Sequence, residues 1–296
     1  MYEGMLIRNA KHPRSANVRL GVGLVTGPGA ISEVSQRFPE RPAVIHGDLT
    51  LCYQDLVTQV GRVAGQLSAL GVEPGDHVAL VGPNSHLYVI AYLGIMHAGA
   101  SVVPVNPMLK PDEVRFMFTD ADVKAAIAFG ELANLVEAAR EGLASPPKLG
   151  TVGESPVPGV AAFDGWPEKG PDGFRPPEVD ENSVEAILYT AGTTGKPKAA
   201  IHRHVNIRHV YETYGRQTLG IQSDDRCLSV AKMFFAYGIG NSLFFPLAAG
   251  ATAVLSPEPP TPDALQATQT AQVLSLIPIL RCRRTPLFTS RWSPYH

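Results

Sequence analysis

The chain has 296 residues, of which 45% are hydrophobic and 18% charged, and its formal net charge at pH 7 is -2. This composition is typical of a globular protein of one or two domains and lacks the basic excess that binds nucleic acid or an acidic membrane. The apolar runs are far shorter than the roughly 20 residues that span a bilayer, and the three cysteines form no Cys-x-x-Cys pair. Leu20–Val25 is too short for a signal peptide. We expect a cytoplasmic protein without stable membrane insertion, disulfides or a metal site.

Strand-like and helix-like segments alternate in the first half of the chain. The β-rich runs are Ala43–His46, Leu49–Tyr53, His77–Val81, Ser101–Val105 and Ala125–Phe129. Helical spacing or helix caps predict helices over residues 56–70, from Ser85 to about Gly99, and from Pro111 onward. Gly47-Asp48 is a hairpin-type turn. Because strands that alternate with helices pair in parallel through crossovers, we predict an α/β fold of mostly parallel sheets with helices on both faces.

The composition changes between Ser145 and Asn182, where eight of the 26 prolines fall and neither helical nor strand periodicity is present. We interpret this stretch as a long surface connection and not as a packed element. Alternation then resumes, with strands predicted at Val184–Tyr189, Ala199–His202, Arg226–Ala231 and Ala251–Leu255. Helices are predicted at Asn206–Leu219, at Gly240–Ala248 and from Thr261-Pro262-Asp263.

These patterns divide the chain into four parts: a first α/β subdomain over 1–145, the Pro/Gly-rich connection over 146–182, a second α/β portion over 183–278, and a tail over 279–296. From Ala264 onward there is no Asp or Glu, and four arginines follow Leu280 without helical or strand spacing. We expect this basic tail to be poorly ordered, as in a truncated or frame-shifted gene.

The run from Tyr189 to Lys198 carries the clearest chemistry. It follows an apolar strand, the usual place for a ligand loop in an α/β fold. Its glycines allow close backbone approach to an anion, its threonines donate hydrogen bonds and its lysines add positive charge. The candidate phosphate-binding residues are Thr190, Gly192, Thr193, Thr194, Gly195, Lys196 and Lys198. Thr190 and Pro197 occupy positions that a Walker P-loop reserves for other residues, so from composition alone a flexible, solvated turn is an equal alternative.

The run Ile187–Lys198 resembles the signature phosphate loop of the adenylate-forming superfamily, which includes acyl-CoA synthetases, luciferases and peptide-synthetase adenylation domains. Four further segments are similar to that family in the same order: Leu51–Leu56, Gly71–Asp76, Pro83–Ser85 and Ala98–Pro107. The resemblance extends from about Ile31 to Pro278. It implies the N-terminal part of that ligase fold, with ATP, Mg²⁺ and coenzyme A as cofactors and a small-molecule carboxylic acid as substrate.

Lys232–Asn241 is similar to the substrate-pocket element of the benzoate-CoA ligase branch. That resemblance assigns Phe235, Ala236, Tyr237 and Gly238 to the acid pocket, and an aromatic wall beside a small residue suits a flat aromatic acid. Without it, the aromatic residues would be read as ordinary core material. The family pattern also makes His204 a positioning residue; His202 and His204 would share one face of a strand, but no cysteine or carboxylate accompanies them as metal ligands.

Two residues depart from the family pattern, since Ala191 and Ala199 stand where serine and glycine are usual. The family's downstream motifs, including its catalytic lysine, are absent, so no catalytic residue is assigned. The resemblance implies the N-terminal portion of an AMP-forming acyl-CoA or aryl-CoA ligase. The alternative is a catalytically silent fragment that at most binds nucleotide. The sequence identifies neither the acid nor the oligomeric state.

Overall fold

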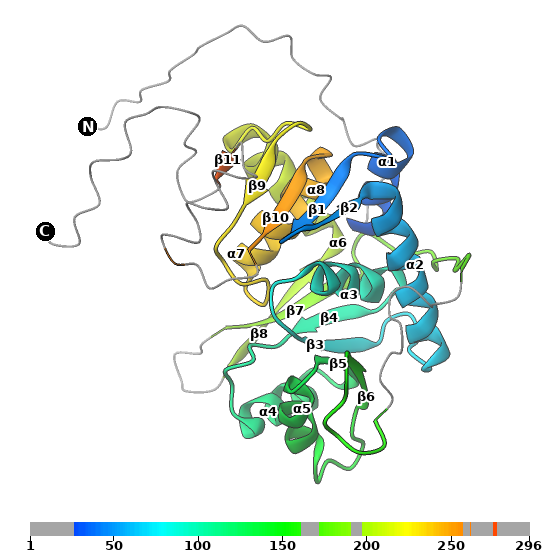
Figure 1. The fold of residues 1–296 in the computed structure, drawn as a ribbon. Coiled ribbons are helices and arrows are strands. Elements are labelled where there is room, and N and C mark those ends of the chain that lie inside the picture. Colours follow the sequence, from blue (N-terminus) through cyan, green and yellow to red (C-terminus); the bar gives the residue numbers. More distant parts are fainter. Residues whose placement is uncertain (1–26, 161–171, 191–196, 257–260, 262–274, 277–296) are drawn as a thin grey trace, which may run out of the picture.

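A computed structural model describes residues 27–160, 172–190, 197–256, 261 and 275–276. The chain forms two β-sheets with helices between and around them (Figure 1). Within the described residues, every helix is too short or too polar to cross a lipid bilayer.

The larger sheet has six strands in the order β6-β5-β3-β4-β7-β8. Their bounds are β3 His77–Val81, β4 Ser101–Pro104, β5 Val123–Phe129, β6 Lys148–Val152, β7 Val184–Thr190 and β8 Lys198–Arg203. Neighbouring strands are parallel except for β7 and β8, which are antiparallel. Alternate residues of β3 pack on opposite faces, so both faces of this sheet are buried.

The smaller sheet has the order β11-β9-β10-β1-β2. Its strands are β1 Pro42–His46, β2 Leu49–Cys52, β9 Arg226–Leu228, β10 Thr252–Leu255 and β11 Ser275–Leu276. The first two are antiparallel and the other pairs are parallel. The tight β1–β2 turn contains Gly47 at φ 61°, a left-handed conformation that glycine adopts without strain.

The helices surround the six-stranded sheet and fill the space between the two sheets (Figure 1). They are α1 Gly27–Arg37, α2 Tyr53–Ala69, α3 His86–His97, α4 Pro111–Asp120, α5 Leu132–Arg140, α6 His204–Val210, α7 Ala236–Ile239 and α8 Phe245–Ala249. Two π-helical segments, η1 Tyr211–Thr218 and η2 Gly240–Phe244, continue α6 and α7. Helices α4 and α5 cover one face of the six-stranded sheet, and α2 and α3 pack in the core on the other.

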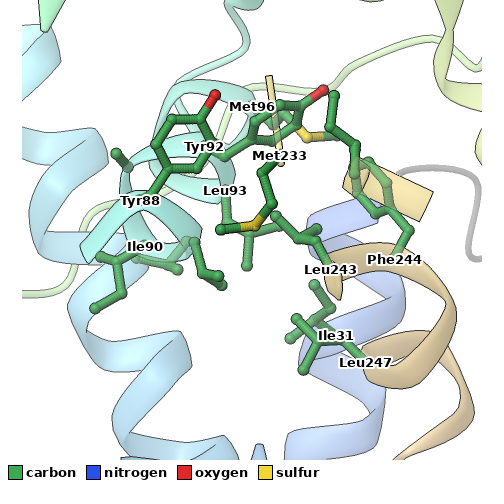
Figure 2. Close-up of a cluster of buried hydrophobic side chains, with 14 of the residues drawn as sticks. Ile31, Tyr88, Ile90, Tyr92, Leu93, Met96, Met233, Leu243, Phe244 and Leu247 are labelled. Carbon is green, nitrogen blue, oxygen red and sulfur yellow. The ribbon is translucent and has the colours of Figure 1, made fainter. Parts of the chain in front are cut away.

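Helix α3 lies between the two sheets, in contact with β1 of one and with β3 and β4 of the other. Every residue from Tyr88 to Met96 is buried, as expected of a helix that is apolar all round. Ser85 caps its first turn by accepting a hydrogen bond from the Tyr88 N–H at 3.1 Å. Figure 2 shows its side chains, including Tyr92, meeting Leu243 and Phe244 of η2. The core is therefore shared by both sheets.

The predicted α/β class with mostly parallel sheets is confirmed. One expectation was wrong: the stretch after Ser145 is not free of packed elements, because Lys148–Val152 forms the parallel edge strand β6. Helices α1 and α5 were not predicted. The helix predicted to open at Thr261 lies outside the described residues apart from Thr261 itself, as does the basic tail over 279–296.

Candidate functional site

Strands β7 and β8 flank the predicted phosphate loop. Thr190 ends β7 and is the register partner of Lys198, which begins β8 and is exposed. The Thr190 hydroxyl donates to the Lys198 carbonyl oxygen at 3.4 Å. The other candidates for phosphate binding, Gly192, Thr193, Thr194, Gly195 and Lys196, lie outside the described residues. The described ends thus place the run between two strands of one sheet, with one lysine open to solvent.

The alanine at position 199 is compatible with its place in the fold. Ala199 lies within β8, paired with Tyr189, and is not among the described residues with positive φ. A methyl group is tolerated on an extended backbone, so the usual glycine is not needed here.

The pocket element begins in a loop fixed by Asn84, which lies just before α3. The Asn84 side chain donates to the Ala231 carbonyl at 2.9 Å and accepts from the Met233 N–H at 2.8 Å. Both bonds bridge about 150 residues of sequence, so they hold this loop against the start of α3. The Pro83–Ser85 segment therefore has a structural role: it caps α3 and positions the chain that leads to Ala236.

The four predicted pocket residues are placed differently. Phe235 and Tyr237 are exposed, at 53% and 42%, whereas Gly238 is buried at the centre of α7. A Cβ atom on Gly238 would lie 2.0 Å from the Lys232 carbonyl oxygen, so no larger side chain fits without movement of the backbone. Ala236 lines a cavity, and the other three residues are not part of the wall of that cavity.

This cavity has a volume of about 150 Å³ and lies between β7, β8 and the helices α3, α6, α7, η2 and α8. Most of its wall is apolar, including Leu188, Val210 and Phe245. A cavity of this size with an apolar lining is large enough for one benzene ring. Ile239, the last residue of α7, and Gly240, the first residue of η2, also form part of the cavity wall. Local π-helical geometry of this kind is frequent at functional sites.

The polar part of the cavity wall centres on Glu185, which is 3% exposed. Tyr92 of α3 donates its hydroxyl to Glu185 Oε1 at 2.9 Å, and both residues line the cavity. The β7–β8 register shifts between Val184 and Ala186, so Glu185 is the extra residue of a β-bulge. A bulge breaks strict alternation, and Glu185 and Ala186 accordingly both face the cavity.

Burial controls the charge of these groups. It raises the pKa of Glu185 to about 8, only partly offset by the Tyr92 hydrogen bond, so this carboxyl is mainly protonated at pH 7. Burial also raises the pKa of the Tyr92 hydroxyl well above its ordinary value. His202 lines the same cavity, and burial lowers its pKa. The polar end of the cavity is thus formed by neutral hydrogen-bonding groups.

His204 is not on the same strand face as His202, contrary to the expectation from sequence. Strand β8 ends at Arg203, and His204 is the first residue of α6. It is 2% exposed, burial lowers its pKa to about 4, and its Nδ1 atom has no hydrogen-bond partner among the described residues. His204 does not line the cavity, whereas His202 does.

Sequence reasoning missed Glu185 and Tyr92 as site residues. One signal was present: Glu185 is the single charge inside the apolar run Val184–Leu188, and a charged residue within a buried strand needs a partner. Tyr92 carried no such signal because it lies in a helix that is apolar throughout.

The sequence of this chain is similar to those of known proteins. The chain is 34% identical over 223 residues to a 4-hydroxybenzoate–CoA/benzoate–CoA ligase of Rhodopseudomonas palustris, covering 75% of this chain and 41% of the relative. It is 34% identical over 220 residues to a benzoate–CoA ligase of Thauera aromatica, covering 72% of this chain and 40% of the relative. The chain therefore spans about two fifths of the length of these relatives.

Solved structures of CoA ligases are similar to this chain as well. A benzoate CoA ligase from Burkholderia xenovorans superposes with a TM-score of 0.75 and 30% identity over 83% of this chain and 48% of that one. An anthranilate CoA ligase solved in complex with anthranoyl-AMP superposes with a TM-score of 0.79 and 25% identity. The match covers 85% of this chain and 49% of that one. A family model described as AMP-binding enzyme matches residues 31–279. The chain belongs to the AMP-binding enzyme family.

Proposed function

We propose that this chain forms the phosphate- and acid-binding part of an AMP-forming aryl-CoA ligase. In the complete reaction a carboxylate attacks the α-phosphate of ATP, giving an acyl-adenylate and pyrophosphate. The thiol of coenzyme A then attacks the acyl carbon and AMP leaves. The observation that carries the proposal is a benzene-sized, mainly apolar cavity bordered by the same strand, β7, that leads into the phosphate loop.

The loop after β7 has the composition to hold a polyphosphate. The Thr190, Thr193 and Thr194 hydroxyls and the Gly192 and Gly195 backbone N–H groups are assigned to the β- and γ-phosphates. Lys196 and Lys198 neutralise the charge that develops as pyrophosphate leaves. The described donors fit this task, since Lys198 is exposed beside the end of β7. Mg²⁺ would accompany ATP, and the chain's own residues bind and orient the nucleotide.

The acid-binding role belongs to the wall around Ala236. Its small side chain leaves room for a flat ring, and Phe245 supplies an aromatic surface in the same cavity. Phe235 and Tyr237 flank Ala236 on the exposed side. Gly238 keeps the backbone of α7 close to Lys232. His204 supports the start of α6. Excluding water from the ring lowers the free energy of its binding.

A second candidate function is binding without turnover. The chain aligns with only 41% of the Rhodopseudomonas palustris ligase, and adenylate formation requires groups on both sides of the α-phosphate. No catalytic residue has been assigned in this chain, and removing even one well-placed electrostatic group typically lowers a rate about a hundredfold to a thousandfold. We expect the 296-residue chain on its own to bind its ligands and to give no measurable turnover.

Two measurements on the purified chain test this. Calorimetry with ATP and with a non-hydrolysable benzoyl-adenylate analogue should give saturable binding of both, and absence of binding would remove the proposed function. Exchange of labelled pyrophosphate into ATP, with benzoate and a medium-chain fatty acid as trial substrates, separates the two candidates. Measurable acid-dependent exchange would contradict the binding-only candidate and establish a complete adenylation site in these residues.

A further inference from the structure

The buried carboxyl of Glu185 has no role in the proposed chemistry, and it is costly to the fold. Taking an ionisable group out of water is unfavourable unless its hydrogen bonds are replaced. Tyr92 provides one of them, to Oε1 at 2.9 Å, and no other hydrogen bond to this carboxyl is present among the described residues. An alanine or valine at this strand position would pack without that cost. A glutamate at position 185 is therefore not explained by its contribution to stability.

The backbone directs this side chain into the cavity. Glu185 is the extra residue of the β7 bulge, and without the shift between Val184 and Ala186 strict alternation would send it and Ala186 to opposite faces. The Ser101 hydroxyl donates to the Val184 carbonyl at 2.8 Å and holds the strand at this bend. Bulges of this kind re-aim side chains next to active sites.

The cavity has distinct apolar and polar regions. Val210 and Phe245 belong to its apolar wall, while Glu185, Tyr92 and His202 provide neutral hydrogen-bonding groups. Glu185 lies near the start of β7, five residues before Thr190, so along an extended strand it is about 16 Å from the phosphate-loop end. A ring acid bound in the cavity with its carboxylate directed toward that loop would have the far side of its ring nearer to Glu185.

We propose that Glu185, positioned by Tyr92, determines specificity for a single-ring aromatic carboxylic acid that carries a hydroxyl or amino substituent on the ring. This inference rests on the proposed function and names the substrate class of the same site. The free oxygen of Glu185 accepts a hydrogen bond from the substituent, and its proton, when present, can be donated to a hydroxyl. An unsubstituted ring leaves that oxygen without a partner.

The physical basis is the cost of an unpaired buried polar group. A site built to hydrogen-bond a substrate hydroxyl rejects an analogue that lacks it far more strongly than an apolar pocket rejects an added hydroxyl. With Glu185 already desolvated in the free protein, a matching substituent gains a hydrogen bond without further dehydration of the protein. A preference of at least about tenfold over the unsubstituted ring is expected.

The test uses the full chain and a set of sulfamoyl-adenosine mimics of acyl-adenylates. The acyl groups are benzoyl and the 2-, 3- and 4-hydroxy- and aminobenzoyl isomers, and dissociation constants are measured by calorimetry. At least one substituted mimic should bind wild type about ten or more times tighter than the benzoyl mimic. In Glu185→Met, which keeps the length of the side chain but not its hydrogen bonds, this ratio should fall to about one. In Tyr92→Phe the ratio should fall by less.

The matched control is Glu178→Met, which changes an exposed glutamate seven residues upstream and should leave the ratio unchanged. If no mimic binds, the proposed function and this inference both fail. If the benzoyl mimic binds as well as every substituted one, or if Glu185→Met keeps the wild-type ratio, the inference is overturned while the proposed function stands. The wild-type ranking of the mimics supports or overturns the inference even if Glu185→Met does not fold.

Discussion

The two ends of strand β7 differ in almost every physical property. At its carboxyl end, Thr190 faces Lys198 at an exposed edge, and the proposed phosphate binding relies on a contiguous run of residues. At its amino end, Glu185 is buried, displaced by a bulge and bonded to a helix 93 residues earlier in the chain. The exposed end is free to bind a charged ligand at little cost to stability. The buried end couples any ligand it recognises to the packing of the core.

The largest expected effect is at Gly238 of α7, the helix whose Ala236 and Ile239 line the same cavity as the buried end of β7. A Cβ atom there meets the Lys232 carbonyl at 2.0 Å, and a backbone atom cannot rotate out of the way. We expect Gly238→Ala to lower the free energy of unfolding by more than about 3 kcal/mol, measured by urea denaturation.

Gly61 of α2 is the matched control, since a Cβ atom there meets nothing within 4 Å. Gly61→Ala should raise the free energy of unfolding by up to about 1 kcal/mol through helix propensity. Equal effects at the two glycines would mean that α7 is not held against Lys232 as described.

The second effect is the pH dependence introduced by Glu185. Its folded pKa of about 8 lies above the ordinary 4.5, so the folded state keeps a proton that the unfolded state releases. The free energy of unfolding therefore falls as pH rises from about 4.5 to about 8. Glu185→Gln removes this dependence, so the variant should gain stability over wild type on the order of a few kcal/mol between about pH 5 and pH 8.

Urea denaturation of both proteins at about pH 5, 6.5 and 8 measures this difference. Tyr92 and His202, the other titratable groups facing the cavity, are present in both proteins, so their own contributions largely cancel. A stability difference that does not change with pH would show that Glu185 titrates as a solvated carboxyl.

A smaller effect is expected at Asn84, whose side chain binds the backbone on both sides of Lys232. Asn84→Ala leaves the Met233 N–H buried without its partner, at a cost of about 1–3 kcal/mol in the free energy of unfolding. The loosened loop should also weaken binding of the benzoyl-adenylate analogue. Asn134→Ala, which removes an exposed bond to Glu131, should change stability by less than about 0.5 kcal/mol.

The smallest effect on stability, with a clear effect on binding, is expected at the exposed end. Lys198→Met should weaken ATP binding about tenfold by removing one charge-assisted hydrogen bond, while the free energy of unfolding stays within about 0.5 kcal/mol. Lys124→Met, at an exposed lysine paired with Asp122, is the control and should not change ATP affinity. A large loss of stability in Lys198→Met would contradict the conclusion that the exposed end of β7 contributes little to the free energy of unfolding.

The same contrast explains what the sequence could reveal. Ordered local motifs identified the family, and hydrophobic periodicity located most strands, including β3 and β7, to within about two residues. Strand β6 was missed because its five residues stand among prolines, and because its burial depends on pairing with β5 and on contact with α5. Glu185 and Tyr92 were missed because a bulge and a helix far apart in the sequence create their contact.

The parallel pairing of β1 with β10 has a consequence for how the protein is made. Val44 pairs with Ala253, so about 200 residues must leave the ribosome after β1 before its partner exists. At about 5–20 residues per second this takes roughly 10–40 s. Before then the six-stranded sheet can assemble, since β8 ends at Arg203, while the side of α3 that η2 and α8 later cover remains open. Nascent chains of this protein should therefore present Ile90 and Leu93 to chaperones until the last strands of the smaller sheet emerge.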